Sequence, residues 1–437
     1  MQEFFKDTGI RKKRLLLTAF TITMVLAAAC SVPSETSHGG EKKENVSETE
    51  SGYEPGEHDK PEEGGKADTG DKAEQEEPLE GEAVMELCRD IYEEAAEAGT
   101  LGSLEVTEAV VNRLGGHGYT AVDWENQINM TNPETVMEFC ESVDEERQAE
   151  VTLLAIASSG GLTKYQCRTK DGKTTVIRED YQWKNGRCEQ AGKIRYAADT
   201  WQYTKEGYLL FGGSYDSKED YVLTLSEGWD GAALRVQPLD ETCREYSRSY
   251  LLPIGYGQNN LFLTDWSEEE FGALDFYDVF DRLYPIVKGQ PVPYKADENL
   301  NIGAEYQIPA EEFETVAASY FAIDKEELRE RTAYVPEDGT YRYRPRGFYE
   351  SDYSDIPFPE VTNYTENADG TITLFVNAVY PEEYASCAFS HKTVIRPLSD
   401  GAFQYVSNEV LPSGQELDLW WHSERLTEEE WEELYLP

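Results

Sequence analysis

Hydrophobic residues are distributed very unevenly along the chain. Residues 15–29 form an almost uninterrupted apolar run, residues 31–82 hold hardly any apolar side chain, and from about residue 83 apolar and polar positions recur with the periods of helices and strands. Only the third part can bury a core, so the pattern predicts an apolar N-terminal segment, a polar linker and a folded body. A body of about 355 residues is large enough for one elaborate domain or for two.

Helical periodicity dominates residues 83–150. Apolar residues recur every three or four positions in "AVMELCRDIYEEAAEAG", which predicts an amphipathic helix. A second helix is expected after Ser103, whose hydroxyl can cap it, and a third after Asn132 and Pro133. This part of the body is therefore predicted to be mainly helical.

Strand signals replace the helical period over residues 151–266. The turns Asp171-Gly172 and Asn185-Gly186 divide one stretch into three strands of an antiparallel meander. Within "TTVIREDYQW" the pattern alternates, and we expect a sheet with one face in water. The expected core-facing residues are Thr175, Ile177, Tyr181 and Trp183, and the expected water-facing residues are Arg178, Asp180 and Gln182.

Helices and β-hairpins are mixed over residues 267–437. Ser267 with Glu270, and Asp324 with Glu327, have the spacing of helix-capping boxes. Strands are expected at "GTYRYRPR", "TITLFVNAVY" and "KTVIRPLSDGAFQYVSNEV", and a last helix at "TEEEWEELYL". Because helices and strands come in blocks without sustained βαβ alternation, the predicted fold class is α+β.

The apolar segment has the three-part form of an export signal. A helix of about 15 residues spans roughly 22 Å, which is shorter than the roughly 30 Å hydrocarbon core of a membrane. Four basic residues (Arg11, Lys12, Lys13 and Arg14) precede it, and its last three residues (27–29) are alanines. Residues 1–29 are therefore predicted to be a signal peptide.

The cysteine that ends this segment indicates a membrane anchor. "LAAAC" resembles the lipobox of bacterial lipoproteins, although Leu26 stands one position earlier than the usual leucine and Ala27 takes its place. The resemblance implies cleavage before Cys30 and attachment of a diacylglyceryl group, with palmitate among its acyl chains, to the Cys30 sulfur. Two acyl chains hold a protein firmly, so the expected location is the extracytoplasmic face of the cell membrane.

Charge separates the linker from the body and limits the partners of both. Residues 30–82 carry a net charge of about −12 and too few apolar groups to fold, so we expect a disordered acidic linker. The whole chain has a net charge of −47, of which about −38 falls on residues 83–437. Because phosphate contacts dominate nucleic-acid affinity, this charge argues against a nucleic-acid partner.

The six cysteines after Cys30 are expected to be mostly free and buried. They form no CxxC pair, which gives no support for a zinc or thioredoxin-type site. Cys167 and Cys188 are the nearest pair along the chain, but they fall on the first and third strands of the expected meander. Such strands lie roughly 9.6 Å apart, beyond the roughly 7 Å limit for bridged Cα atoms.

No established catalytic or metal-binding motif occurs in the body. "DENLNIGAEYQI" begins like an EF-hand but has Ile302 and Ile308 where glycine and glutamate are required. Ser158 and Ser159 lack the flanking glycines of a nucleophile elbow, and the histidines at 117, 391 and 422 have no ligand spacing. We therefore assign no catalytic residue, metal or cofactor from the sequence.

One basic stretch contrasts with the acidic background. In a strand, "YRYRPRGFYE" would project Arg342, Arg344 and Arg346 to one face. Three aligned guanidinium groups suit a phosphate or carboxylate ligand, although the chain's many carboxylates offer the same pairing internally. These three arginines are the candidate ligand-binding residues.

Several segments of the body together resemble a family of uncharacterised clostridial lipoproteins. They are "VDWENQINMTNPE", "LRVQPLD", "YLLPIGYGQNNLFLTDW", "YRYRPRGFYE" and "AFSHKTVIRPLSDGAFQYVSNEV". The resemblance covers roughly residues 105–410 and implies a surface protein of a Gram-positive bacterium. The family has no assigned activity, so the resemblance assigns no catalytic residue.

Two functions compete on these grounds. The first is a non-enzymatic surface lipoprotein that binds a ligand, a cell-wall polymer or a surface protein, or has a structural role. The second is a cell-wall or polysaccharide hydrolase that uses a pair of acidic residues. The oligomeric state is left open.

Overall fold

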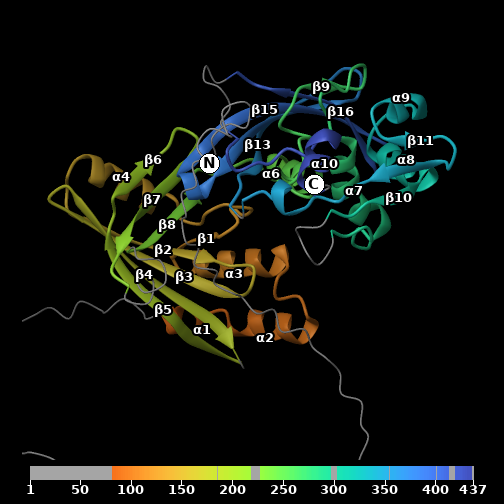
Figure 1. Cartoon of the computed structure of the whole chain (residues 1–437). Coiled ribbons are helices and arrows are strands. Elements are labelled where there is room, and N and C mark those ends of the chain that lie inside the picture. Colours follow the sequence, from red (N-terminus) through yellow and green to blue (C-terminus); the bar gives the residue numbers. More distant parts are fainter. Residues whose placement is uncertain are drawn as a thin grey trace, which may run out of the picture.

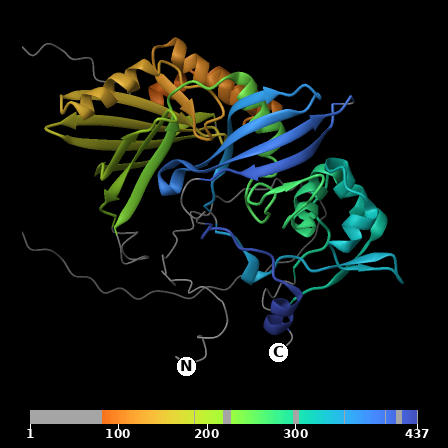
Figure 2. The ribbon, with the colours of Figure 1, turned by 90° about the horizontal axis from the view of Figure 1, so that it is seen from above.

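The computed structural model describes residues 81–435 apart from 185, 218–226, 297–302, 354, 400 and 413–418. Helices and mainly antiparallel strands occur in separate groups, which confirms the predicted α+β class. Residues 81–235 and 241–435 form two halves that lie side by side (Figures 1 and 2). Cys30, the predicted signal and the predicted linker up to residue 80 fall outside the described residues, whereas Gly81 and Glu82, the last two residues of that linker, begin a helix.

The first half combines helices with two sheets. Its described helices are α1 (Gly81–Glu86), α2 (Arg89–Ala98), α3 (Leu104–Gly116) and α4 (Glu134–Asp144). Its strands are β1 (Thr120–Asp123), β2 (Ala149–Ile156), β3 (Gly161–Lys170), β4 (Lys173–Lys184), β5 (Arg187–Ala197), β6 (Thr200–Tyr203), β7 (Tyr208–Tyr215) and β8 (Gly228–Arg235). Strands β1 to β5 form one sheet in chain order, and β6, β7 and β8 form another.

The second half begins with helices inside the block expected to be all β. These are α6 (Glu241–Tyr246) and a π-helical turn (Ser247–Leu251). The further helices are α7 (Phe276–Lys288), α8 (Ala310–Tyr320), α9 (Lys325–Glu330) and α10 (Glu428–Tyr435). The strands are β9 (Trp266–Ser267), β10 (Tyr306–Pro309), β11 (Tyr334–Val335), β12 (Thr340–Tyr343), β13 (Phe358–Glu366), β14 (Ile372–Tyr380), β15 (Ala385–Pro397) and β16 (Phe403–Val410).

The expected three-stranded meander is confirmed as β3, β4 and β5. The hairpin between β3 and β4 pairs Lys170 with Lys173 across Asp171 and Gly172, both of which have positive φ. The six cysteines in the described residues carry no disulfide, and four of them are buried, as predicted. Strand β1 was not predicted, because it lies within residues 83–150, which were expected to be mainly helical. It pairs with β2 in parallel.

The sheet β1–β5 does not leave one face in water, contrary to expectation. On one face Leu162 and Tyr181 pack against α1, α2 and α3. On the other face Cys167 and Val176 belong to a core shared with α4 and with the sheet of β6, β7 and β8. A second layer that arrives from distant sequence therefore covers the face that local alternation assigned to solvent.

The predicted orientation of β4 is accordingly wrong over its first half. Thr175 and Ile177 are only partly buried, at the end of the sheet that α1–α3 do not reach, while Val176 between them is fully buried. Tyr181 and Trp183 do meet the N-terminal helices, and Trp183 stacks on Tyr92 with ring centroids 5.5 Å apart. Alternation fixes which residues share a face but not which face is covered.

Helix starts follow the sequence at two positions and depart from it at a third. Ser103 caps α3 by accepting a hydrogen bond from the Val106 amide, and Asp324 caps α9 in the same way. Asn132 does not cap α4: it has a φ of 49°, and its side chain donates to the carbonyl of Tyr119 at 2.7 Å. The Asn132 side chain instead stabilises the connection between α3 and β1 through this hydrogen bond.

Ser267 and Glu270 do not form a capping box. Ser267 lies in the two-residue strand β9, which pairs with Ser407 at the edge of the sheet β13–β14–β15–β16–β9. The helix begins nine residues later, at Phe276, where Asp275 accepts hydrogen bonds from the amides of Tyr277 and Asp278. Long-range strand pairing overrides the local signal here.

Each half has its own hydrophobic core. The two large clusters of the first half lie between residues 84 and 236, and the cluster of the second half lies between residues 239 and 421. Among the described residues, no helix is both long and apolar enough to cross a membrane.

A small cluster and a buried ion pair join the halves. Tyr208 and Leu210 of β7 pack with Val379 of β14. Glu360 of β13 accepts a hydrogen bond from the Tyr208 hydroxyl at 2.7 Å and pairs with Arg235 of β8 at 2.6 Å. Both charged side chains are almost fully buried, so separating the halves would leave each charge without its partner.

Candidate functional site

A pocket in the described part of the chain lies where the two halves meet. Its volume is about 650 Å³, within the range of small-molecule sites. Residues from the β1–α4 loop, β4, β8, the π-helix end, β13 and the β14–β15 connection line it. They include Trp124, Glu125, Asn126, Gln127, Arg178, Trp229, Asp230, Leu252, Phe358, Pro381, Glu382 and Tyr384.

Aromatic side chains form the walls of this junction pocket. Trp124 and Trp229 are 37% and 50% exposed, which is unusual for indole rings in a folded protein. Trp124 stacks on the buried ring of Tyr165 with ring centroids 6.2 Å apart, and Trp124 also lines the pocket. Two fixed, partly exposed indoles offer flat apolar surfaces to a ligand.

Tyr384 is held beside Trp229 by an uncommon backbone conformation. Its φ of 51° lies in the left-handed region, which a tyrosine rarely adopts. The ring lies directly over two glycines: a Cβ added at Gly231 would lie 2.0 Å, and one at Gly212 2.2 Å, from the Tyr384 hydroxyl oxygen. That hydroxyl accepts a hydrogen bond from Trp229 Nε1. Strain of this kind persists only where the surroundings impose it, which is common at binding sites.

An arginine provides the cationic group of the pocket. Arg178 donates to Asp180 from Nε at 3.0 Å and to Asp230 from one terminal nitrogen. Asp230 is almost fully buried, whereas the Arg178 side chain keeps 28% of its surface exposed. No hydrogen bond of the second terminal nitrogen of Arg178 occurs within the described residues, so this nitrogen is available to a ligand.

The loop that carries Trp124 is fixed by amide side chains. Asn126 donates to the Ala233 carbonyl at 2.9 Å and accepts from the Arg235 amide at 2.7 Å, which ties the loop to β8. Asn129 exchanges two hydrogen bonds with the backbone of Leu239 and accepts from the buried guanidinium of Arg244. The segment "VDWENQINM" therefore forms a rigid wall.

Carboxylates lie on the rim of the pocket. Glu125 accepts a hydrogen bond from the Ser158 hydroxyl at 2.8 Å. Glu382 belongs to the second half and lines the pocket from that side. Partial burial, together with the nearby charges of Asp355 and Asp230, raises the pKa of Glu382 above the usual range. One carboxylate with a raised pKa and one hydrogen-bonded carboxylate thus face the same space.

The composition of the pocket selects against anions. Three carboxylates line it (Glu125, Asp230 and Glu382) and only one guanidinium (Arg178). Since Asp230 already pairs with Arg178, the rim carries the remaining negative charge. The combination favours a neutral or cationic ligand that has an apolar face and several hydrogen-bond donors.

The three arginines proposed from the sequence lie elsewhere, and each meets a carboxylate of the chain. Arg342 pairs with Glu428, Arg344 pairs with Glu305 at 3.0 Å, and Arg346 pairs with Asp278 at 2.7 Å. Strand β12 ends at Tyr343, so they do not continue along one strand face. A ligand of these arginines stays a prediction.

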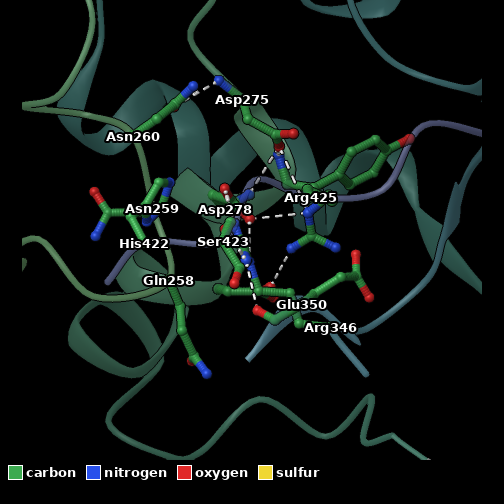
Figure 3. A network of polar contacts seen from close by, with 12 residues as sticks. Gln258, Asn259, Asn260, Asp275, Asp278, Arg346, Glu350, His422, Ser423 and Arg425 are labelled. Atoms are coloured by element: carbon green, nitrogen blue, oxygen red, sulfur yellow. Dashed lines mark hydrogen bonds and ion pairs between the residues drawn. The ribbon is translucent and has the colours of Figure 1, made fainter. Parts of the chain in front are cut away.

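Arg346 belongs to a buried ionic network that fastens the C-terminal segment (Figure 3). Arg425 donates to Asp278 at 2.9 Å and to Asp281 at 2.6 Å, both on α7. Burial raises the pKa of Asp281, and it does the same for Asp275 at the start of the helix. Because the network's charges are paired and lie in the interior, we assign it a structural role.

The histidines of the body do not converge. His391 is fully buried: its Nε2 lies 2.9 Å from the Tyr256 hydroxyl and its Nδ1 lies 2.8 Å from Asn408 Oδ1. The Asn408 amide nitrogen donates to the Thr264 carbonyl, so its oxygen faces His391 and Nδ1 carries the proton. Burial lowers the His391 pKa to about 3, which keeps the ring neutral. His422 lies beside Asp352, and His117 ends α3.

Sequence patterns contain only indirect signs of the junction pocket. "VDWENQINM" belongs to one of the segments that carry the family resemblance, and Ser158 lacks the flanking glycines of a nucleophile elbow, but no local pattern places Ser158 beside Glu125. The site draws on residues 124 to 384, so its assembly depends on the contact between the halves. No group of three or more histidine, cysteine or acidic residues with metal-site geometry occurs in the described part.

Comparison with known proteins identifies the family without identifying an activity. No curated protein matches the chain, and no solved structure matches it. A family of unknown function (DUF6070) matches residues 74–425, which extend from the predicted linker to Arg425 of the ionic network. The chain belongs to this family of unknown function.

Proposed function

We propose that this protein is a lipid-anchored, extracytoplasmic protein that binds a saccharide in the junction pocket. The signal pattern and Cys30 support the location, and the acidic linker would hold the folded body away from the lipid surface. The observation that carries the binding role is the pair of partly exposed indoles, Trp124 and Trp229, in the junction pocket.

A saccharide matches each chemical feature of the pocket. The C–H face of a sugar ring is apolar and stacks on an aromatic side chain, while its hydroxyl groups donate to carboxylates and accept from N–H groups. Glu125, Gln127 and Glu382 supply acceptors, and Arg178 supplies a donor. A neutral sugar also avoids the repulsion that the chain's net charge imposes on anions.

Binding is testable by titrating the full chain, purified in detergent, with neutral oligosaccharides of glucose and of N-acetylglucosamine and following tryptophan fluorescence. We expect saturable binding of a neutral saccharide and no binding of an oligogalacturonate of equal length. Trp229→Ala should weaken binding about tenfold, which corresponds to about 1.4 kcal/mol.

Trp420 provides the matched control for this experiment. It is 47% exposed, close to the value for Trp229, but it does not line the pocket. Trp420→Ala should leave the affinity unchanged. Equal weakening by both substitutions, or no saturable binding of any neutral saccharide, would remove the assignment.

A hydrolase is the second candidate because of Glu382. A carboxyl group with a raised pKa is suited to donate a proton to a leaving group, and a second carboxylate such as Glu125 could assist from across the pocket. Incubation with cell-wall polysaccharide separates the two functions. Release of reducing ends that Glu382→Gln abolishes would establish a hydrolase, whereas saturable binding without release supports a binding protein.

A further inference from the structure

A basic groove lies on the face of sheet β1–β5 that carries helices α1–α3. The helices cover the part of this face around Leu162 and Tyr181, and the groove occupies the uncovered end. Its volume is about 400 Å³. The residues that line it are Gln148, Ala149, Glu150, Gln166, Arg168, Thr169, Lys170, Lys173, Thr175, Ile177 and Arg195.

Strand register brings the basic side chains of the groove to one face. Lys170 lies opposite Lys173 at the end of the β3–β4 hairpin, and Arg195 lies opposite Ile177, two strands across from β3. Directly opposed residues project to the same side of a sheet, as do residues two apart along a strand. Arg168, two positions before Lys170, therefore shares this face.

Three of these cations have no carboxylate partner within the described residues. Arg168 pairs with Glu150 at 3.0 Å, and Gln166 donates to the same carboxylate, so the one acidic group of the groove is already neutralised. No ion pair involves Lys170, Lys173 or Arg195 in the part of the chain that the structure describes. All three side chains are exposed.

This arrangement is unexpected in so acidic a protein. The chain has 86 acidic and 39 basic residues, so a carboxylate is available to most cations. The arginines at 342, 344 and 346 illustrate the usual outcome, since each is paired. A face that keeps a net positive charge against this background has the charge of an anion-binding surface.

We propose that this basic groove binds a compact polyvalent oxyanion, such as an oligophosphate or a polycarboxylate. Lys173 and Arg195 are separated by about 13 Å along the strands and about 5 Å across them. Their long side chains can converge on an anion several ångströms long, and such an anion can contact more of the cations than a single phosphate does. A long polymer would extend beyond the groove into the acidic surface, which repels it.

Because salt screens distant charges, the affinity of the groove for a small anion does not depend on the net charge of the protein. At physiological ionic strength the Debye length is about 8 Å, so an ion held in the groove interacts mainly with the cations that line it. The proposal does not depend on the saccharide site, which lies at the junction of the halves and has the opposite charge.

The test is calorimetric titration of the full chain in detergent with tripolyphosphate, citrate and monophosphate at 20 and 150 mM salt. We expect saturable binding of tripolyphosphate or citrate, at least tenfold tighter than monophosphate and weaker at the higher salt concentration. Equal affinity for monophosphate, or no saturable binding of either polyvalent anion, would overturn the proposal.

A matched pair of triple variants assigns the binding to the groove. Lys170→Gln, Lys173→Gln and Arg195→Gln together should weaken binding at least tenfold. Lys205→Gln, Lys288→Gln and Lys325→Gln together remove the same charge from exposed positions elsewhere and should change it less than twofold. Equal losses in the two variants, each with an unchanged melting temperature, would refute a local site, and Trp229→Ala should leave anion binding intact.

Discussion

Single residues in this protein have roles that their types alone do not reveal. Tyr384 is an aromatic residue on a strand connection by sequence, yet it adopts a left-handed conformation over two glycines and holds Trp229. His391 has no ligand spacing by sequence, and the structure places it in a closed hydrogen-bonding network as a neutral ring. In both cases the surroundings determine the state of the side chain.

Gly231→Ala tests whether Tyr384 requires the space above β8. The added Cβ would lie 2.0 Å from the Tyr384 hydroxyl, so the ring must move and its hydrogen bond from Trp229 is lost. We expect a loss of about 1–3 kcal/mol in the free energy of unfolding and at least tenfold weaker saccharide binding. Urea unfolding and fluorescence titration measure the two effects.

Gly116→Ala is the control for that substitution. Nothing lies within 4 Å of a Cβ added at Gly116, at the end of α3. This variant should bind as the original chain does and lose no stability. Unchanged binding by Gly231→Ala would show that Tyr384 has no part in the site.

The lowered pKa of His391 predicts that the free energy of unfolding decreases at acidic pH. Its pKa falls from 6.5 to about 3 on folding, so between these values the unfolded chain binds the proton and the folded chain does not. Stability from this residue therefore falls as the pH falls below 6.5, by at most about 1.4 kcal/mol per pH unit.

Comparison with His391→Gln isolates this contribution from the many carboxylates, which titrate in both proteins. The difference in free energy of unfolding between the two proteins should shrink steadily from pH 6.5 to pH 4. Urea unfolding at intervals of half a pH unit provides the measurement. A difference that is constant over this range would show that the histidine is not neutral in the folded state.

Whole elements were predictable where local periodicity and capping decide their position. The helix after Ser103, the meander β3–β5 and the last helix α10 follow their sequence signals. Strand β9 and the covered faces of sheet β1–β5 were not predictable in this way. They depend on pairing and packing between residues that are distant along the chain, such as Ser267 with Ser407 and Cys167 with Leu209.

The C-terminal segment depends on its ionic contacts with α7. Arg425→Ala would leave the buried Asp278 and the partly buried Asp281 with fewer positive partners, because only Arg346 would still pair with Asp278. We expect a loss of about 3–5 kcal/mol in the free energy of unfolding. Faster proteolysis near residue 425 should accompany the loss.

Arg396→Ala serves as the comparison for this element. Its pair with Glu268 is partly exposed, with both side chains near one-third accessibility, so solvent already screens the charges. The substitution should cost much less than Arg425→Ala. Similar losses in the two variants would argue that Arg425 is not an essential contact of the segment.

At the scale of the molecule, the sequence predicted the division into segment, linker and body but not the junction pocket. Composition alone separates residues 31–82 from the body. The pocket, in contrast, forms only where the loop after β1, strand β8 and the β14–β15 connection come together. No local sequence pattern predicts these long-range contacts. The proposed location therefore rests on sequence composition, and the proposed ligand rests on the long-range contacts in the structure.

Cys30→Ser tests the proposed membrane anchor. In cells grown with labelled palmitate, the original chain should incorporate the label and sediment with membranes, because two acyl chains give firm attachment. The variant should lose the label. An intact mass of the mature original chain should show cleavage before Cys30 and the added diacylglyceryl group.

Cys387→Ser is the matched control, since it replaces a half-buried thiol of the body whose sulfur forms hydrogen bonds with the Phe389 carbonyl and the Ser390 hydroxyl. It should keep both the label and the membrane association. Label in the Cys30→Ser variant, or an unmodified sulfur at Cys30 in the mature chain, would contradict the anchor.

The backbone passes between the two halves once, between Val236 in the core of the first and Leu239 in the core of the second. Each half is thus continuous, and the first can finish folding while the second is still being synthesised. Until the second arrives, the Tyr208 and Leu210 side chains have no cover from Val379, and Arg235 has no counter-charge from Glu360. A newly made chain interrupted at this stage would expose an apolar patch beside an unpaired cation. Such a chain would need a chaperone more than the complete protein does, and proteases would degrade it more readily.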